Sequence, residues 1–303
     1  MVVSTDHGNK QIKTPNRVFP SGLVERSREM TIGNQDTIRY NEKYYTLSEN
    51  RLHYMPDKTV DSHFLILTLF AIAYEIEHNQ AYKENDYISI DLLTGLPPAH
   101  LALQKDTFAA YFKAGDGIDF DMNGKPYHVI IDSVQVYPQG FSAVLPCFKE
   151  IKETPYSFIV DIGGMTVDYL QLANGKPNLE VCSSLEKGII KLYSDINRRL
   201  ITDAGEELTE RQIDAAIKGK YNPETKELID SMCRNYVRDL LNQLREEAGN
   251  FKSAQLYFVG GGSNTLRRYI ENCYDLIRNP HFINDVHANA KGYEILYQSK
   301  KKA

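Results

Sequence analysis

Short runs of apolar and β-branched residues recur along the chain and end at glycine, proline or asparagine, which is the pattern of strands joined by turns. The strands predicted from these runs are 2–5, 10–14, 37–40, 43–47, 87–93, 118–122, 127–131, 133–137, 158–160, 167–172, 179–183 and 254–259. The pair Asn123-Gly124 separates two of them and favours a tight hairpin turn, because both residues tolerate positive φ.

Longer segments with apolar residues at helical spacing lie between the strands. The predicted helices are 61–79, 101–114, 141–149, 187–201, 209–218, 223–248 and 263–271. Asp61 is a candidate N-cap of the first helix. Both halves begin with a strand, an Asp-x-Gly turn, a second strand and a further hairpin, and helices follow. This weak duplication predicts an α/β protein with two related domains, a boundary near residue 150 and a cleft between the domains.

Composition excludes several classes of protein. The 303 residues are 42% hydrophobic and 25% charged, with a net charge of −5, as in ordinary globular proteins. The basic residues form only isolated pairs and a terminal tail, so direct nucleic-acid binding is not expected. Four scattered cysteines argue against a zinc site or a disulfide framework and favour a cytoplasmic location. The longest apolar stretch, 64–74, is too short to span a membrane.

Two glycine-bearing turns headed by aspartate are the candidate chemistry. The first is Asp6-His7-Gly8-Asn9, and the second is Asp161-Ile162-Gly163-Gly164-Met165-Thr166. Glycine lets the backbone bring its N–H groups against an anion, and each aspartate can hold water on a divalent metal. Two such loops facing each other would bind the phosphates of one nucleotide from both sides. The sequence therefore points to an ATP-dependent protein.

A third glycine segment, Gly260-Gly261-Gly262-Ser263, lies between a predicted strand and a predicted helix. Close backbone approach and a helix N-terminus suit an anion or the flat faces of a nucleotide. Each of the three segments is a weak signal alone, because a glycine after a strand is usually only a turn. Their occurrence together, in this order, is much more specific.

With these motifs the sequence resembles the actin-like ATPases and, within them, the bacterial ParM (StbA-like) plasmid-segregation group. The resemblance rests on residues 6–13, Phe19-Pro20-Ser21, Tyr40-Asn41-x-Lys43-x-Tyr45, Thr94-Gly95-Leu96-Pro97, Pro138-Gln139-Gly140, residues 161–168, residues 260–263 and Ala288-Asn289-Ala290-x-Gly292. The last motif is the most distinctive for ParM-like proteins. The resemblance implies an actin-like (ribonuclease H-like) fold with a nucleotide in the cleft between two lobes, 1–150 plus 287–303 and 151–286.

The resemblance also implies roles for residues around the phosphates. In the first loop, which includes Gly8, Asn9 would donate to the phosphates and Lys13 would reach the β-phosphate. Asp6 and Asp161 would hold hydrated Mg²⁺ through water, as carboxylates do for this metal. Gln139 would orient the attacking water for hydrolysis. The second loop would contribute Gly163, Gly164 and Thr166, whereas Asp168 is expected to brace its own loop.

For the nucleoside, the resemblance assigns two segments. Gly260, Gly261, Gly262 and Ser263 would border the adenosine, and Glu186, Lys187 and Gly188 would lie near the ribose and base. The chain also departs from the family pattern: Lys10 stands where the first loop usually has glycine, His7 is an uncommon residue there, and ParM has glutamate at the position of Gln139. Hydrolysis is still expected, and the choice between ATP and GTP stays open.

The expected function is an actin-like ATPase that polymerises into dynamic filaments on binding ATP. A ParR-like adaptor bound to centromere-like DNA would connect the filament to a plasmid or similar cargo, and the mild acidity of the chain agrees with that division of labour. The alternative is a small-molecule kinase or a polyphosphate phosphatase of the same superfamily. A kinase would need a carboxylate base aimed at a substrate hydroxyl, and no obvious base occupies that place.

Overall fold

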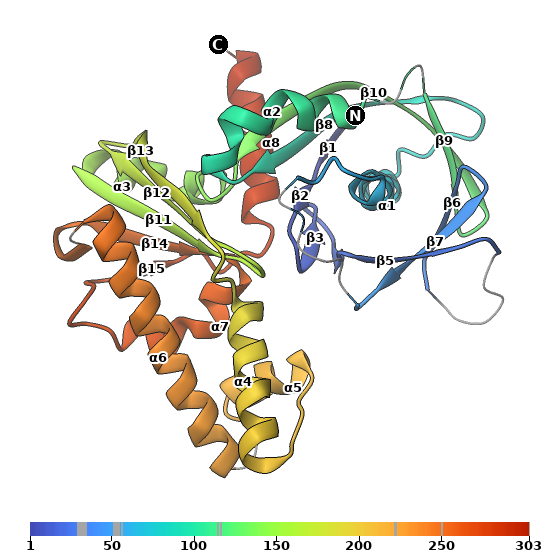
Figure 1. The fold of residues 1–303 in the computed structure, drawn as a ribbon. Coiled ribbons are helices and arrows are strands. Elements are labelled where there is room, and N and C mark those ends of the chain that lie inside the picture. Colours follow the sequence, from blue (N-terminus) through green and yellow to red (C-terminus); the bar gives the residue numbers. More distant parts are fainter. Residues whose placement is uncertain are drawn as a thin grey trace. The chain divides into compact units, whose positions relative to one another are not determined.

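The computed structural model describes residues 1–28, 35–50, 55, 57–113, 115, 117–220, 223–249 and 251–302. The chain forms two compact units, Met1–Leu145 with His287–Ala303, and Pro146–Val286. Residues 146–150, which the sequence placed in the first unit, belong to the second. The first unit therefore contains both the blue N-terminal strands and the red C-terminal helix α8 (Ala288–Lys302) of Figure 1.

A seven-stranded sheet forms the framework of the first unit, in the order β1-β8-β10-β9-β6-β7-β5. Its strands are β1 (Val2–Ser4), β5 (Gly22–Arg26), β6 (Thr37–Tyr40), β7 (Lys43–Ser48), β8 (Ile88–Leu96), β9 (Ile118–Met122) and β10 (Lys125–Pro138). β1 and β10 both pair in parallel with β8, so these three strands end at the same edge of the sheet. The remaining pairs are antiparallel, and two of them are hairpins: β6-β7, and β9-β10 with the predicted turn at Asn123-Gly124.

Helix α1 (His63–His78) lies inside the curve of this sheet, as the end-on view in Figure 1 shows. Its residues from Phe64 to Ala73 are all buried, including side chains on opposite faces of the helix. A helix that is apolar all round must be covered all round. The curved sheet meets that requirement, while α2 (Pro98–Tyr111) packs against β10 and β8.

A small antiparallel sheet adjoins these elements and consists of β2 (Asp6–His7), β3 (Gln11–Lys13) and β4 (Val18–Pro20). β3 is the return strand that the sequence predicted after the first Asp-x-Gly turn. In its register Asp6 lies opposite Lys13. The first loop is therefore a tight hairpin with an acid and a base at its two ends.

The second unit is built on a five-stranded sheet in the order β13-β12-β11-β14-β15. Its strands are β11 (Tyr156–Ile162), β12 (Val167–Ala173), β13 (Lys176–Leu185), β14 (Gln255–Val259) and β15 (His281–Phe282). Its helices are η1 (Ser142–Cys147, which begins in the first unit), α3 (Phe148–Glu153), α4 (Ile189–Ala204), α5 (Glu210–Ile217), α6 (Pro223–Ala248), η2 (Phe251–Ser253) and α7 (Gly260–Glu271). Buried apolar residues of β11, α4, α6 and α7 make one continuous core.

The structure corrects several predicted boundaries. The single helix predicted at 141–149 is a 3₁₀ helix followed by α3, because Pro146 has no N–H with which to continue an α-helix. The two strands predicted at 127–131 and 133–137 are one strand, β10, with an irregularity between Ile131 and Ser133. Asp61 is not the N-cap of α1: Ser62 occupies that position, and the Asp61 carboxylate accepts a hydrogen bond of 2.9 Å from the His63 N–H.

The structure also contains elements that the sequence analysis missed. β4, β5, β15 and the C-terminal helix α8 were not predicted, and β8 runs three residues beyond its predicted end, to Leu96. The extension includes Gly95, where an added Cβ would lie 2.1 Å from the Tyr293 hydroxyl of α8. Only glycine fits there, so a residue that usually ends a strand is instead needed for close packing.

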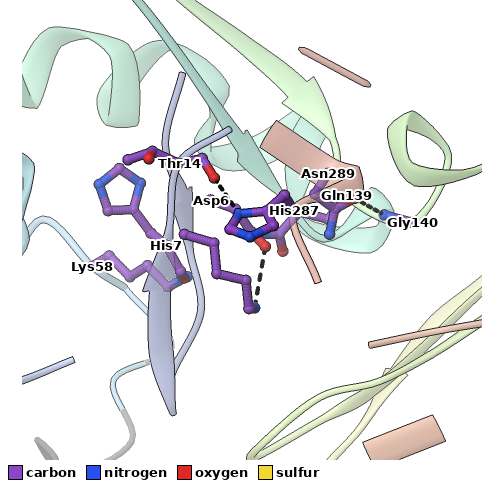
Figure 2. Close-up of polar contacts among 9 residues, drawn as sticks. Asp6, His7, Thr14, Lys58, Gln139, Gly140, His287 and Asn289 are labelled. Atoms are coloured by element: carbon purple, nitrogen blue, oxygen red, sulfur yellow. Dashed lines mark hydrogen bonds and ion pairs between the residues drawn. The ribbon is translucent and has the colours of Figure 1, made fainter. Parts of the chain in front are cut away.

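His7 is a fully buried anchor of the first loop. Its Nδ1 lies 2.8 Å from the Thr94 hydroxyl of β8, and its Nε2 lies 2.8 Å from the Thr68 hydroxyl of α1. The Thr68 hydroxyl donates to the Phe64 carbonyl, so it accepts from Nε2–H, and Nδ1 then accepts from Thr94. The Lys58 ammonium donates to the His7 carbonyl (Figure 2). Burial, reinforced by the Lys58 charge, lowers the pKa of His7 well below 6.5.

This anchor predicts a specific dependence of stability on pH. As the pH falls below 6.5, unfolded His7 takes up a proton and folded His7 does not, so the wild type loses stability, by up to about 1.4 kcal/mol per pH unit. His7→Gln lacks this contribution, so its unfolding free energy should approach that of the wild type as the pH falls. Urea unfolding without nucleotide or metal, from pH 7.5 to pH 5, measures the difference. A constant difference would mean that His7 titrates equally in both states.

Candidate functional site

Asp6 and Gln139 form the centre of the site in the first unit. The Asp6 carboxylate is only 4% exposed, and its Oδ1 accepts a hydrogen bond of 2.8 Å from Gln139 Nε2 (Figure 2). The Lys13 ammonium lies 3.4 Å from the other oxygen, Oδ2. Three residues with expected roles in metal binding, phosphate binding and water positioning are therefore in contact, although Gln139 is 133 residues from Asp6 in sequence.

The strand register explains why these residues meet. β8 is parallel to both β1 and β10, so the segments that follow β1 and β10 leave the same edge of the sheet. Thr5 N–H donates to Leu93 O of β8 at 2.8 Å, and Gln139 N–H donates to Leu96 O at 2.9 Å. The carboxyl ends of parallel strands are where α/β proteins commonly bind ligands, because loops from separate strands converge there.

The turn of the first loop requires glycine at position 8. An added Cβ would lie 2.6 Å from Gln11 O and 3.2 Å from Lys13 Nζ, so a side chain there would disturb the hairpin and its lysine. Asn9 follows at a half-buried position, and its carbonyl accepts a hydrogen bond of 2.7 Å from Ser21 Oγ. The loop is thus tied to the Phe19-Pro20-Ser21 segment, which no site prediction included.

The second loop joins β11 to β12 in the other unit. Asp161 and Asp168 are cross-strand partners, and Gly163 N–H donates to Thr166 O at 2.9 Å to close the turn. Thr166 Oγ1 donates to Asp168 Oδ2 at 3.0 Å, so Asp168 braces its own loop as predicted. This bond fixes the Thr166 side chain. Asp161 lies at the carboxyl end of its strand, β11.

The segment Glu186-Lys187-Gly188 packs against this second loop. Gly188 N–H donates to Met165 O at 2.8 Å, and the next two N–H groups of α4 donate to Gly163 O and Gly164 O at 3.0 Å. An added Cβ at Gly188 would lie 2.2 Å from Gly164 O. The N-terminus of α4 therefore holds the shape of the loop with its own backbone, and Glu186 is left exposed at the surface.

The glycines at 260–262 form the first turn of α7, not a loop before a helix. Gly260 has φ +90°, and a Cβ there would lie 2.3 Å from Asp161 Oδ1, so the helix start and the Asp161 carboxylate are in close contact. Gly262 packs equally closely on Ile162. Ser263 is buried and donates to Val259 O, while Gly261 faces open space. Of this segment, Gly261 is the residue most accessible to a ligand.

Asp6 and Asp161 each carry the carboxylate oxygens that magnesium takes as ligands. Among the residues that the structure describes, no three His, Cys, Asp or Glu side chains cluster as a closed metal site. Magnesium does not need such a cluster, because it keeps several waters and is commonly held by one or two carboxylates plus substrate phosphates. Asp6 and Asp161 each stand at a strand end beside a glycine turn, where they could hold metal-bound water.

In the described part of the chain, no helix is long and apolar enough to cross a membrane.

Comparison with known families and structures gives a consistent result. The family model "Actin like proteins N terminal domain" matches residues 4–141, and "Archaeal actin homologue MreB-like, C-terminal" matches residues 159–272. No curated protein sequence matches significantly.

Among solved structures, the archaeal actin homologue Ta0583 has 17% identity and a TM-score of 0.77, with 99% of each chain covered. Its complex with ADP has 17% identity and a TM-score of 0.76, again with 99% of each chain covered. A 15-stranded ParM filament from Clostridium botulinum has 19% identity and a TM-score of 0.75, with 98% of this chain and 99% of that chain covered. The predicted actin-like α/β fold is confirmed, and both halves of the chain match family models of actin-like proteins.

Proposed function

We propose that this protein is an ATPase that binds one Mg²⁺-ATP with the two Asp-Gly turns, one from each unit. The observation that carries the proposal is the contact of Asp6 with both Gln139 and Lys13 beside a glycine turn. Structural relatives support it, since the archaeal actin homologue Ta0583 has been solved with ADP. GTP remains an alternative nucleotide.

The backbone N–H groups of Gly8, Asn9, Gly163 and Gly164 would donate to phosphate oxygens. Lys13 would pair with the β-phosphate, and the Thr166 hydroxyl would complete the second loop. Bound Mg²⁺ would neutralise phosphate charge, with Asp6 and Asp161 holding its waters. Gly260 and Gly261 would border the adenosine, with Gly262 and Ser263 supporting that turn from within α7. Glu186, Lys187 and Gly188 would lie near the ribose and base.

Gln139 is proposed to position the attacking water. Only the NH₂ end of its amide can face the Asp6 carboxylate, because a carboxylate accepts hydrogen bonds and does not donate them. This fixes the orientation of the amide and directs its carbonyl oxygen away from Asp6. That oxygen can accept a hydrogen bond from water and align it with the γ-phosphate, which is the role a glutamine serves in other phosphoryl-transfer sites.

The proposed cellular role is a cytoplasmic filament that segregates plasmid or similar DNA. The filament structure of a ParM from Clostridium botulinum supports self-assembly of this fold, and a head-to-tail contact that does not close generates a helix. The net charge of −5 favours contact with DNA through a separate, ParR-like adaptor on centromere-like DNA.

Two substitutions test the catalytic roles. Gln139→Ala should lower ATP hydrolysis by on the order of 10–100-fold with ATP affinity largely intact, because it removes water positioning and not phosphate binding. Asp161→Ala should nearly abolish hydrolysis. Gln135→Ala is the matched control, because Gln135 lies in β10, the strand that Gln139 follows; this variant should hydrolyse ATP like the wild type. Phosphate release and equilibrium ATP titration measure the two effects. Wild-type hydrolysis by Gln139→Ala would refute the positioning role.

Filament formation is tested separately. Purified protein with ATP and Mg²⁺ should scatter light above a critical concentration and form filaments in negatively stained electron micrographs, and without nucleotide it should do neither. Gln139→Ala, which should keep its ATP affinity and hydrolyse slowly, serves as the control for dependence on hydrolysis, since its polymers should persist after assembly. If no polymer forms under any of the nucleotide and salt conditions, the small-molecule kinase or polyphosphate phosphatase would be favoured.

A further inference from the structure

The C-terminal part of the chain re-enters the first unit at His287, and its first residues contact the segments that carry the site. We refer to residues 287–292 as the return segment. His287 Nδ1 lies 2.6 Å from Thr14 O, next to Lys13. Ala290 O accepts a hydrogen bond of 2.6 Å from the fully buried Ser4 Oγ, two residues before Asp6. Figure 2 shows the contacts of His287 and Asn289 around Asp6 and Gln139.

The most direct contact with the proposed catalytic turn comes from Asn289. Its side-chain Oδ1 accepts a hydrogen bond of 2.9 Å from Gly140 N–H, across 149 positions in sequence. Asn289 is only 8% exposed, so the bond is shielded from water. The N–H of Gly140 belongs to the peptide group that follows Gln139, and this bond therefore fixes the backbone from which the Gln139 side chain extends.

The neighbouring N–H groups of the turn donate to backbone carbonyls, whereas the Gly140 N–H donates to a side chain. Gln139 N–H donates to Leu96 O at 2.9 Å, and Phe141 N–H donates to Gln139 O at 2.8 Å. Gly140 has φ +72°, a conformation that non-glycine residues rarely adopt. Helix α8 lies close to the turn. An added Cβ at Gly292 would lie 2.0 Å from Ser142 O, so the glycine permits this close approach.

We propose that Asn289 is a positioning residue for ATP hydrolysis, acting through Gln139. The inference rests on the proposed function. If Gly140 N–H loses its acceptor in this buried place, the turn must shift to find another, because an unsatisfied buried donor is costly. Such a shift moves Gln139 relative to Asp6, and small displacements of a positioning group strongly reduce rates. The Ala-Asn-x-x-Gly motif thus has a physical explanation. Asn289 accepts the hydrogen bond from Gly140 N–H, and Gly292 allows α8 to approach Ser142 closely.

The test is a double-mutant cycle between positions 289 and 139. Asn289→Ala removes the acceptor, and Asn289→Asp keeps an oxygen at the same place. In the wild-type background, Asn289→Ala should lower kcat by on the order of tenfold with ATP affinity changed less than about twofold. Asn289→Asp should retain most of the wild-type kcat. In the Gln139→Ala background, Asn289→Ala should change kcat by less than about twofold, because the group through which it acts is gone.

A general structural role predicts a different outcome. If Asn289 only supports the fold, Asn289→Ala should lower kcat by the same factor in both backgrounds. That result would overturn the positioning role of Asn289 and leave the ATPase proposal intact. A wild type that hydrolyses no nucleotide would overturn both. Thermal unfolding checks that each variant is folded; if Asn289→Ala is not, Asn289→Ser, whose shorter side chain reaches less far towards Gly140, takes its place in the same cycle.

Discussion

The hydrogen bond between Gln139 and Asp6 is the interaction on which the proposed chemistry depends. It joins two turns that follow separate strands of one sheet, and it exists because β1 and β10 run parallel on either side of β8. A buried carboxylate needs partners, and Asp6 has an amide on one oxygen and a lysine on the other. The same residues that satisfy Asp6 are the ones proposed to bind phosphate and to position water.

Close packing around glycine gives the second unit a comparable constraint. Gly260 lets the start of α7 approach the Asp161 carboxylate, and Gly188 lets the start of α4 approach the second loop. A side chain at position 260 would push α7 away from the strand end that carries Asp161, and one at position 188 would push α4 away from the second loop. Each unit thus has an aspartate at a strand end beside a glycine turn, but the contacts differ: side chains hold Asp6, whereas the glycine backbone at the start of α7 lies against Asp161.

Local patterns predicted the local features well. The Asp-Gly turns, the Asn123-Gly124 hairpin and most helices depend on neighbouring residues, so sequence spacing was sufficient. The start of α7 was misplaced, because three glycines ordinarily favour a loop and here form a helical turn against Ile162. The contacts of His7 with Thr68 and Thr94, and of Asn289 with Gly140, join residues far apart in sequence, and no periodic pattern encodes them.

The central claim is that a single nucleotide is bound by both Asp-Gly turns. A crystal structure of the protein with Mg²⁺ and a non-hydrolysable ATP analogue tests it most directly. The account predicts triphosphate oxygens within hydrogen-bond distance of backbone N–H groups in both residues 6–13 and residues 161–168. A nucleotide that contacts only one of these turns, or that binds elsewhere on the protein, would contradict it.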